Sequence, residues 1–345
     1  MGTTDELPKE LRDIINGGAA LLALELGCKL GIFGTMISLG PATIQQIAAG
    51  ARIHPAHARD WVAALQTAGL AEPVGDDRFQ LSVAMTTIAA DDTRLGEVAS
   101  YARVVGTLWS LSADVATSFR TGAGIDPSRY SEFERLLDEE HALEYPRRLP
   151  QLLNQAGLSD LLHDGAHVAD LGCGTGRAIL TLAEKFPNST FVGFDLSTSA
   201  IDVAIASASS LSLTNVRFEE RDLSDFADTA QYDLILMFDV LHEQAALETL
   251  LQRVSRALRP SGAVLCCEMD SRSKYARDYG TYLRVLSTMH CTAVSLYNNG
   301  IGPGLFFGIE GAHSLLVKSG FRDVSVLRYP EPDGALYLLA RATPV

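Results

Sequence analysis

A short apolar segment followed by three closely spaced glycines is the feature that most restricts the fold of this chain. Residues 166–171 form an apolar run, and Gly172, Gly174 and Gly176 follow it before a helix-like segment at 177–186. The length and composition of the run are typical of a buried parallel strand. Glycines let the backbone approach a ligand that any Cβ would block. Strand, glycine turn and helix together predict the nucleotide-binding half of a doubly wound α/β sheet, with a ligand at the carboxyl ends of the strands.

The spacing of the glycines separates two classes of cofactor. Dinucleotide enzymes use G-x-G-x-x-G, with the pyrophosphate at the helix N-terminus. Here the third glycine comes one residue earlier, and Asp170 precedes the first. This D-x-G-x-G-x-G pattern resembles motif I of the class I S-adenosylmethionine-dependent methyltransferases. The resemblance implies that the cofactor is S-adenosylmethionine, and that its binding residues include Asp170, Gly172, Cys173, Gly174 and Gly176.

Further strand-like segments follow in the order that this family shows. They are predicted at 190–196, 216–220, 232–239 and 262–268. After a helix at 312–319, two more segments at 321–329 and 335–342 are separated by Pro-Glu-Pro-Asp-Gly, which predicts a hairpin. The resemblance therefore implies an α/β fold over residues 161–345, a Rossmann-like class I methyltransferase sheet with an antiparallel C-terminal hairpin.

The resemblance also assigns cofactor contacts outside the glycine turn. Asp195 ends the second predicted strand, about 20 residues after the glycines, where an acid accepts the ribose hydroxyls. Asp222 is placed beside the adenine amino group. Aromatic side chains just upstream of motif I commonly cover the cofactor in this family, which favours Tyr130 and Phe133. The remaining expected contacts are Leu196, Leu223, Phe238 and Asp239.

The segment after the strand at 232–239 limits the acceptor. Enzymes that methylate nucleobase amino groups carry Asp/Asn-Pro-Pro-Tyr/Phe here, whereas this chain has Asp-Val-Leu-His. The paired glutamates of protein arginine methyltransferases are also missing from the sequence, which leaves a small-molecule acceptor. His242 is the first candidate for a general base, with Glu243 to orient it; its alternative role is to cap a helix starting near Gln244 or to hold the backbone. His290, in the insertion before the last helix, is a second catalytic candidate, with a packed structural role as its alternative.

Residues 1–94 predict a mostly α winged-helix domain in front of a helical connector at 95–160. Helices at 43–48 and 55–69 precede a hairpin at 70–82. Such domains bind DNA in regulators and dimerise many small-molecule methyltransferases. Seven basic and eleven acidic side chains give residues 1–95 a net charge of −4, whereas a groove-reading helix needs several cations. The layout resembles actinobacterial-type methyltransferases with an N-terminal winged helix, and the predicted partner is a second copy of the chain, a homodimer.

Composition argues against other classes of partner. A formal net charge of −14 is unsuited to nucleic acid. The most apolar early stretch, 19–39, is broken by Glu25 and Lys29, so no membrane span is predicted. The polar, acidic N-terminus lacks the pattern of a signal peptide, which predicts a cytoplasmic protein. The five cysteines show no C-x-x-C spacing, so we expect buried free thiols and no metal site.

The sequence therefore predicts transfer of a methyl group from S-adenosylmethionine to a small molecule, with S-adenosylhomocysteine as the second product. Two alternatives stay open at this level. One is a winged-helix transcriptional regulator that senses S-adenosylmethionine, and the other is non-methylating chemistry on the same cofactor. The sequence does not assign the acceptor or its reacting atom, whether O, N, S or C.

Overall fold

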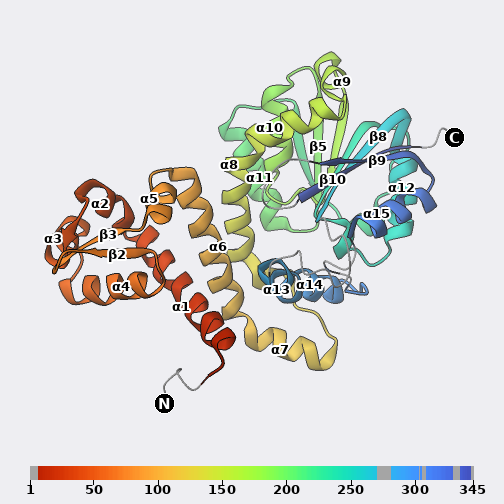
Figure 1. The fold of residues 1–345 in the computed structure, drawn as a ribbon. Coiled ribbons are helices and arrows are strands. Elements are labelled where there is room, and N and C mark those ends of the chain that lie inside the picture. Colours follow the sequence, from red (N-terminus) through yellow and green to blue (C-terminus); the bar gives the residue numbers. More distant parts are fainter. Residues whose placement is uncertain (1–6, 270–280, 303, 305–307, 329–334, 343–345) are drawn as a thin grey trace. The chain divides into compact units, whose positions relative to one another are not determined.

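The chain divides into two compact units, Met1–Ser110 and Leu111–Val345. The computed structural model describes residues 7–269, 281–302, 304, 308–328 and 335–342 (Figure 1). The sequence predicted a first boundary at residue 94, but this position lies inside the helix α6 (Asp92–Ser110). Because α6 packs on α1 (Lys9–Lys29), the contacts place the whole helix in the first unit.

The first unit is mostly helical, with a small antiparallel sheet in the order β1-β3-β2. Thr43 caps α3 through a capping box with Gln46, and Pro55 begins α4 at a position that needs no backbone donor. Phe33 and Trp61 pack with ring centroids 5.4 Å apart in the core of this unit. Its other elements are α2 (Ile32–Leu39), β1 (Ala42–Thr43), α3 (Ile44–Ala51), α4 (Pro55–Thr67), β2 (Ala71–Val74), β3 (Arg78–Leu81) and α5 (Val83–Ala89).

The apolar N-terminal stretch is two helices. Leu30 and Gly31 separate α1 from α2, and Gly31 has the left-handed backbone φ of 65° that favours glycine. Among the described residues no single helix has the length and composition of a membrane span, and the pair α1 and α2, which passes the same test jointly, is bent by 75°.

The second unit contains a seven-stranded sheet in the order β6-β5-β4-β7-β8-β10-β9. The first five of these strands are parallel, and β10 runs antiparallel to both β8 and β9. The predicted antiparallel ending is therefore confirmed, while the turn predicted at 330–334 lies outside the described residues. The strands are β4 (His167–Leu171), β5 (Thr190–Asp195), β6 (Val216–Glu220), β7 (Tyr232–Phe238), β8 (Leu258–Met269), β9 (Phe321–Arg328) and β10 (Ala335–Ala342).

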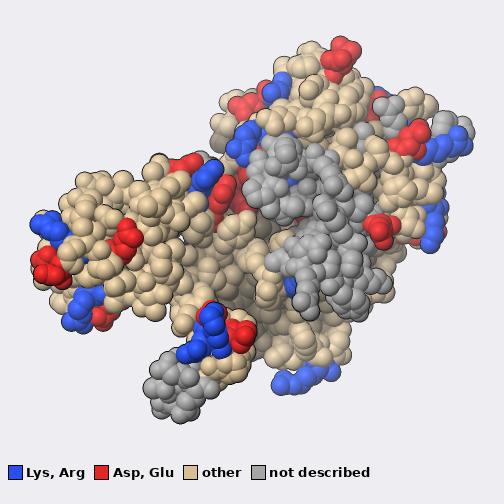
Figure 2. Space-filling model, in the orientation of Figure 1, with Lys and Arg blue, Asp and Glu red and all other residues tan. Residues whose placement is uncertain are grey.

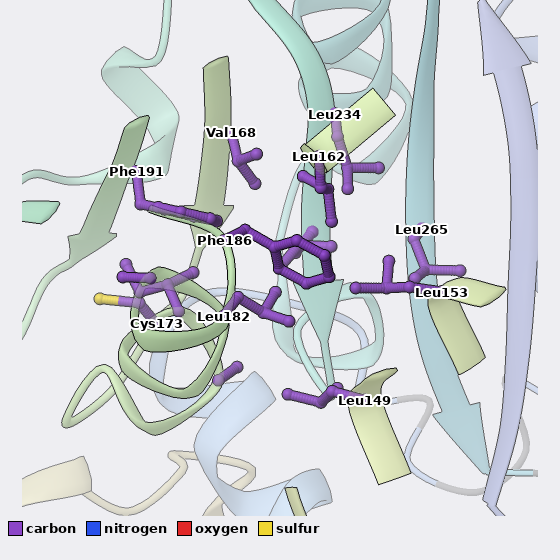
Figure 3. Packing of buried hydrophobic residues seen from close by; sticks show 14 of the residues in the cluster. Leu149, Leu153, Leu162, Val168, Cys173, Leu182, Phe186, Phe191, Leu234 and Leu265 are labelled. Atoms are coloured by element: carbon purple, nitrogen blue, oxygen red, sulfur yellow. The ribbon is translucent and has the colours of Figure 1, made fainter. Parts of the chain in front are cut away.

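Helices cover both faces of this sheet, as Figure 1 shows. The helical segments of the second unit are α7 (Ser112–Thr121), η2 (Pro127–Tyr130), α8 (Ser131–Gln155), α9 (Ser159–Asp164), α10 (Arg177–Lys185), α11 (Thr198–Ser210), η3 (Leu223–Asp225), η4 (Leu241–Glu243), α12 (Leu247–Ala257), α13 (Thr281–Met289), α14 (Cys291–Tyr297) and α15 (Gly308–Lys318). Figure 3 shows side chains from α8, α10 and the central strands pointing toward one another around Phe186. Adjacent Cys266 and Cys267 on β8 belong to the two different core clusters, as the alternation of side chains along a strand predicts.

Candidate active site

The glycine turn after β4 has the backbone that its sequence predicts. Gly172, Gly174 and Gly176 all have positive φ, between 53° and 76°. A Cβ on Gly176 would lie 2.4 Å from the Phe218 ring, so this glycine is required for packing. Nothing lies within 4 Å of the place where a Cβ on Gly174 would be, at the carboxyl end of the sheet. A side chain at residue 174 would therefore fill open space, as expected of a cradle for a ligand.

Two acids shape the electrostatics of this turn, and one of them, Asp195, also holds it in place. The Gly174 N–H donates to Asp195 Oδ2 at 2.8 Å, and the Ser197 N–H donates to Asp195 Oδ1 at 2.9 Å. Burial raises the pKa of Asp195, and these backbone donors oppose the rise. Burial raises the pKa of Asp170 to about 8, with a further contribution from the Asp195 charge. Asp170 is thus an enclosed carboxyl group, and Asp195 links the end of β5 to the glycine turn.

Asp138 on α8 contacts the same turn, a role that no motif in the sequence predicted. Its carboxylate accepts hydrogen bonds from the Thr175 hydroxyl at 2.5 Å and from Arg177 Nε at 3.0 Å. Arg177 Nη2 lies 2.7 Å from the second carboxylate oxygen, which makes the pair bidentate. These hydrogen bonds hold α8 against the start of α10, beside the candidate cofactor site.

The other expected cofactor contacts differ in exposure. The Asp222 carboxylate accepts the Ser224 N–H at 2.7 Å and caps η3, while Leu223 is buried. Leu196 is exposed just after β5. Cys173 is buried, and burial raises the pKa of its thiol. Asp170, Asp195 and Asp222 thus lie at the carboxyl ends of three neighbouring parallel strands, β4, β5 and β6.

The loop after β7 returns toward the glycine turn. Asp239 has a φ of 56°, and its N–H donates to the Cys267 carbonyl at 3.1 Å. Val240 packs against Gly172 so closely that a Cβ there would lie 2.5 Å from the valine methyl. Phe238 at the end of β7 meets the Tyr145 ring of α8 edge to face at 6.3 Å. The residues that follow, in η4, are therefore held next to the glycine turn.

A buried imidazole–carboxylate pair occupies this place. His242 Nδ1 lies 2.8 Å from Glu268 Oε2 on β8, and the Leu241 N–H donates to Glu268 Oε1 at 3.0 Å. Burial by itself lowers the pKa of His242, but the Glu268 carboxylate and Cys291 raise it well above the ordinary value. The Cys291 side chain also hydrogen-bonds His242.

The alternative role of His242 as a helix cap is wrong, because α12 begins only at Leu247 and its cap residue is Ala246. Glu243, which the sequence predicted to orient the His242 ring, does not make the direct contact with it. Glu243 Oε1 lies 4.0 Å from His242 Nε2, whereas Glu268 makes the direct contact with the ring. Burial raises the pKa of Glu243 to about 7, and the nearby His242 charge opposes the rise. Glu268 could have been proposed from the sequence, because it ends a predicted strand and the carboxyl ends of parallel strands meet at one edge of the sheet.

His290 lies within an aromatic cluster. Its ring centroid is 4.6 Å from that of Tyr130 and 4.5 Å from that of Phe133. Burial, followed by the His242 charge, lowers the pKa of His290 to about 3, which keeps the ring neutral. The Tyr130 hydroxyl donates to the Met289 carbonyl at 2.6 Å. Tyr130 of η2 and Phe133 of α8 therefore pack against the junction of α13 and α14, and His290 has the packed surroundings of its alternative role.

Two further contacts join the same segments. The Ile125 N–H donates to the Ala293 carbonyl at 3.0 Å, and the Tyr297 hydroxyl donates to Asp126 at 3.0 Å. At Gly124 a Cβ would lie 2.0 Å from the Tyr297 backbone nitrogen, so only glycine permits this approach. Residues 124–133 and α13–α14 consequently form one cover beside η4, which α14 contacts.

The strand order, the antiparallel β10 and the glycine turn define a Rossmann-like domain of the class I methyltransferase type. Residues 162–299 match the family model described as a methyltransferase domain.

Comparisons with individual proteins agree with this classification. The chain is 32% identical over 145 residues to a trans-aconitate 2-methyltransferase of Deinococcus radiodurans. The aligned region covers 40% of this chain and 50% of that protein. It is 29% identical over 252 residues to the tetracenomycin polyketide synthesis 8-O-methyl transferase of Streptomyces glaucescens, covering 70% of this chain and 73% of that one. The chain spans about half the length of the first curated relatives it matches.

Solved structures extend the similarity of fold to both units. An S-adenosylmethionine-dependent methyltransferase, SibL, superposes with a TM-score of 0.71 at 21% identity, over 97% of this chain and 99% of that one. Human N-acetylserotonin methyltransferase, solved in complex with S-adenosylmethionine, gives a TM-score of 0.60 at 20% identity over the full length of both chains.

Proposed function

We propose that this protein transfers a methyl group from S-adenosylmethionine to a hydroxyl group of a small molecule. The observation that carries this proposal is the buried His242–Glu268 pair at the carboxyl edge of the sheet, next to the glycine turn. A hydroxyl acceptor must lose its proton during transfer, and the neutral form of a positioned imidazole is a suitable base; the raised pKa of His242 means that this form is reached at alkaline pH. Relatives that are named O-methyltransferases support the same choice of acceptor atom.

Residues of the glycine turn would hold the cofactor. Gly174 offers a surface without a side chain, and Asp195 at the end of β5 offers carboxylate oxygens for ribose hydroxyls. Asp222 follows β6, in position for the adenine. When bound, S-adenosylmethionine supplies a methyl group on a positively charged sulfur. Burial keeps Asp170 protonated near neutral pH, so Asp195 is the acid whose charge suits a cation and would repel phosphates, which fits S-adenosylmethionine better than a dinucleotide.

His242 would act on the acceptor through Nε2, because Glu268 engages Nδ1. The carboxylate keeps the ring in one orientation and stabilises the imidazolium that forms when the proton is taken. The cover made by residues 124–133 and α13–α14 excludes water from this edge, which favours transfer to the acceptor over side reactions.

The proposed role of the first unit is dimerisation through a winged-helix arrangement. α1 leaves one apolar face exposed, formed by Leu11, Ile14, Ile15, Leu22 and Leu26. Its candidate recognition helix, α4, has Arg59 as its one cation, and this side chain pairs with Asp60 at 2.8 Å. On the face drawn in Figure 2, acidic and basic side chains of the described residues are interspersed over this unit. This charge pattern favours a second copy of the chain, rather than DNA, as the partner of the first unit.

The test is turnover by the purified full-length chain. The protein is incubated with S-adenosylmethionine and a panel of phenols, alcohols, amines, thiols and carboxylic acids, and formation of S-adenosylhomocysteine is measured. Turnover with hydroxyl acceptors is the expected result. Tight binding of NADH without binding of S-adenosylmethionine would overturn the proposal. Sequence-specific DNA binding with a steep salt dependence and no turnover would favour a regulator.

A further inference from the structure

Three side chains of metal-ligating types, one of them the proposed base, lie close together, although the spacing along the sequence did not predict a metal site. Each of His242, Glu243 and Cys291 offers one ligand atom, and these atoms all lie within 4.8 Å of one another. His242 and Glu243 come from η4, and Cys291 is the first residue of α14, which packs on η4. We propose that His242, Glu243 and Cys291 bind a divalent cation of the zinc class.

The chemistry of the donors selects this class of ion. Imidazole, carboxylate and thiolate are the three protein ligands that zinc takes, at about 2.0–2.3 Å. Donors around a tetrahedral ion are then separated by about 3.3–3.8 Å. His242 Nε2 and Glu243 Oε1 are 4.0 Å apart, so small side-chain rotations complete the geometry. A thiolate and an imidazole disfavour magnesium and calcium, which prefer oxygen ligands.

The surroundings of His242 supply an independent observation. A metal-binding histidine usually donates its second ring N–H to a carboxylate or carbonyl, which fixes the tautomer. Glu268 Oε2 is placed for this role at 2.8 Å from Nδ1, and its other oxygen is fixed by the Leu241 N–H. Nε2 is then the nitrogen that faces the ligand side. All three donors are at least three-quarters enclosed, which protects a thiolate–metal bond from water.

Three protein ligands leave the fourth position of a tetrahedral ion open, as in zinc sites that accept water or a substrate. The ion would take the same Nε2 lone pair that the proposed function assigns to the acceptor proton. Zinc and the acceptor proton therefore compete for one nitrogen, and the metal-loaded protein lacks its base. This consequence rests on the proposed function, whereas binding of the ion does not.

The experiment uses cobalt(II) as a coloured substitute for zinc. Metal-free full-length protein is titrated with Co²⁺, and a thiolate-to-cobalt charge-transfer band is expected to saturate at one equivalent. Zn²⁺ should then displace the cobalt and remove the band. Cys291→Ser should abolish the band, while Cys28→Ser, which changes a thiol of the first unit, should leave it unchanged.

Two further variants guard against a folding defect. Glu243→Gln should retain the band but weaken Zn²⁺ binding at least tenfold, because an amide is a poorer ligand than a carboxylate. Glu268→Gln should weaken binding by about 10- to 100-fold through loss of the outer carboxylate. Circular dichroism checks that each variant is folded. A missing band in the parent protein, or a band that survives Cys291→Ser, would overturn the proposal. Neither result depends on methyl transfer, so the two proposals fail separately.

Discussion

Glu268 and His242 are joined by a 2.8 Å contact between a carboxylate oxygen and Nδ1, and both side chains are buried. The two residues are 26 positions apart; His242 follows β7, and Glu268 lies near the end of the neighbouring parallel strand β8. With Nδ1 engaged by Glu268, the second ring nitrogen, Nε2, faces Glu243 Oε1 at 4.0 Å. The first prediction tests this arrangement directly.

His242→Gln should reduce turnover by about 10²- to 10⁴-fold, the usual loss when a positioned base is removed. The glutamine amide can still donate to Glu268, so we expect little change in the melting temperature or in S-adenosylmethionine affinity. Steady-state kinetics and calorimetry measure these quantities. His290→Gln is the matched control, because it removes a packed ring and should lower stability more than turnover per folded molecule. The reverse pattern would make His290 the base.

Asp195→Ala should weaken S-adenosylmethionine binding by about 10- to 100-fold. A hydrogen bond to a charged group contributes about 1.5–3 kcal/mol, and Asp195 also positions the Gly174 N–H. Isothermal titration calorimetry measures the affinity. Asp202→Ala changes an exposed acid on α11 and should bind as the parent does. Equal affinities of the two variants would remove Asp195 from the binding site.

Gly174→Ala and Gly176→Ala should separate binding from folding. Both positions have positive φ, which costs an alanine about 1–2 kcal/mol. At Gly174 the new methyl enters open space, so the variant should fold but lose affinity for S-adenosylmethionine. At Gly176 it meets the Phe218 ring, so the melting temperature should fall much further. A Gly174→Ala variant with parent affinity would mean that the ligand does not approach this residue.

Asp170 predicts a pH dependence of stability. Burial raises its pKa to about 8 in the folded protein, against about 3.9 in an unfolded chain. Between these values the unfolded chain releases a proton that the folded protein keeps, so the free energy of unfolding falls as pH rises. Asp170→Asn cannot titrate. The melting temperature of the variant relative to the parent should therefore increase from pH 5 to pH 8, and a constant difference would contradict the raised pKa.

Ile14→Glu and Leu22→Glu should convert a dimer into a monomer. Their side chains are 70% and 63% exposed on α1, where a second copy is proposed to pack. A buried glutamate without a partner opposes association. Sedimentation velocity measures the mass in solution. Val83→Glu, an equally apolar and 80% exposed position on α5, should leave the dimer intact. A parent protein that sediments as a monomer would refute the interface.

Local sequence determined the nucleotide-binding half of the catalytic fold. The segments at 216–220 and 335–342 were predicted with the observed bounds, because alternating or apolar segments between turn residues carry their own signal. The three glycines of motif I likewise lie where the backbone turns with positive φ, which glycine adopts without strain. The N-terminal helix boundaries were less clear, since the apolar stretch 19–39 gives one continuous pattern although Leu30 and Gly31 break it into two helices.

Only the tertiary structure decided which side chains share the candidate site. Glu268 on β8 contacts His242, which follows the neighbouring strand β7. Asp138 on α8 contacts Thr175 of the glycine turn, 37 positions further along the chain. Cys291 comes beside His242 because α14 packs on η4. Spacing along the chain carries no signal for such contacts, since they depend on how separate elements pack. The sequence therefore determined the turn that would bind a cofactor, while packing brought together the acid, the imidazole and the thiol.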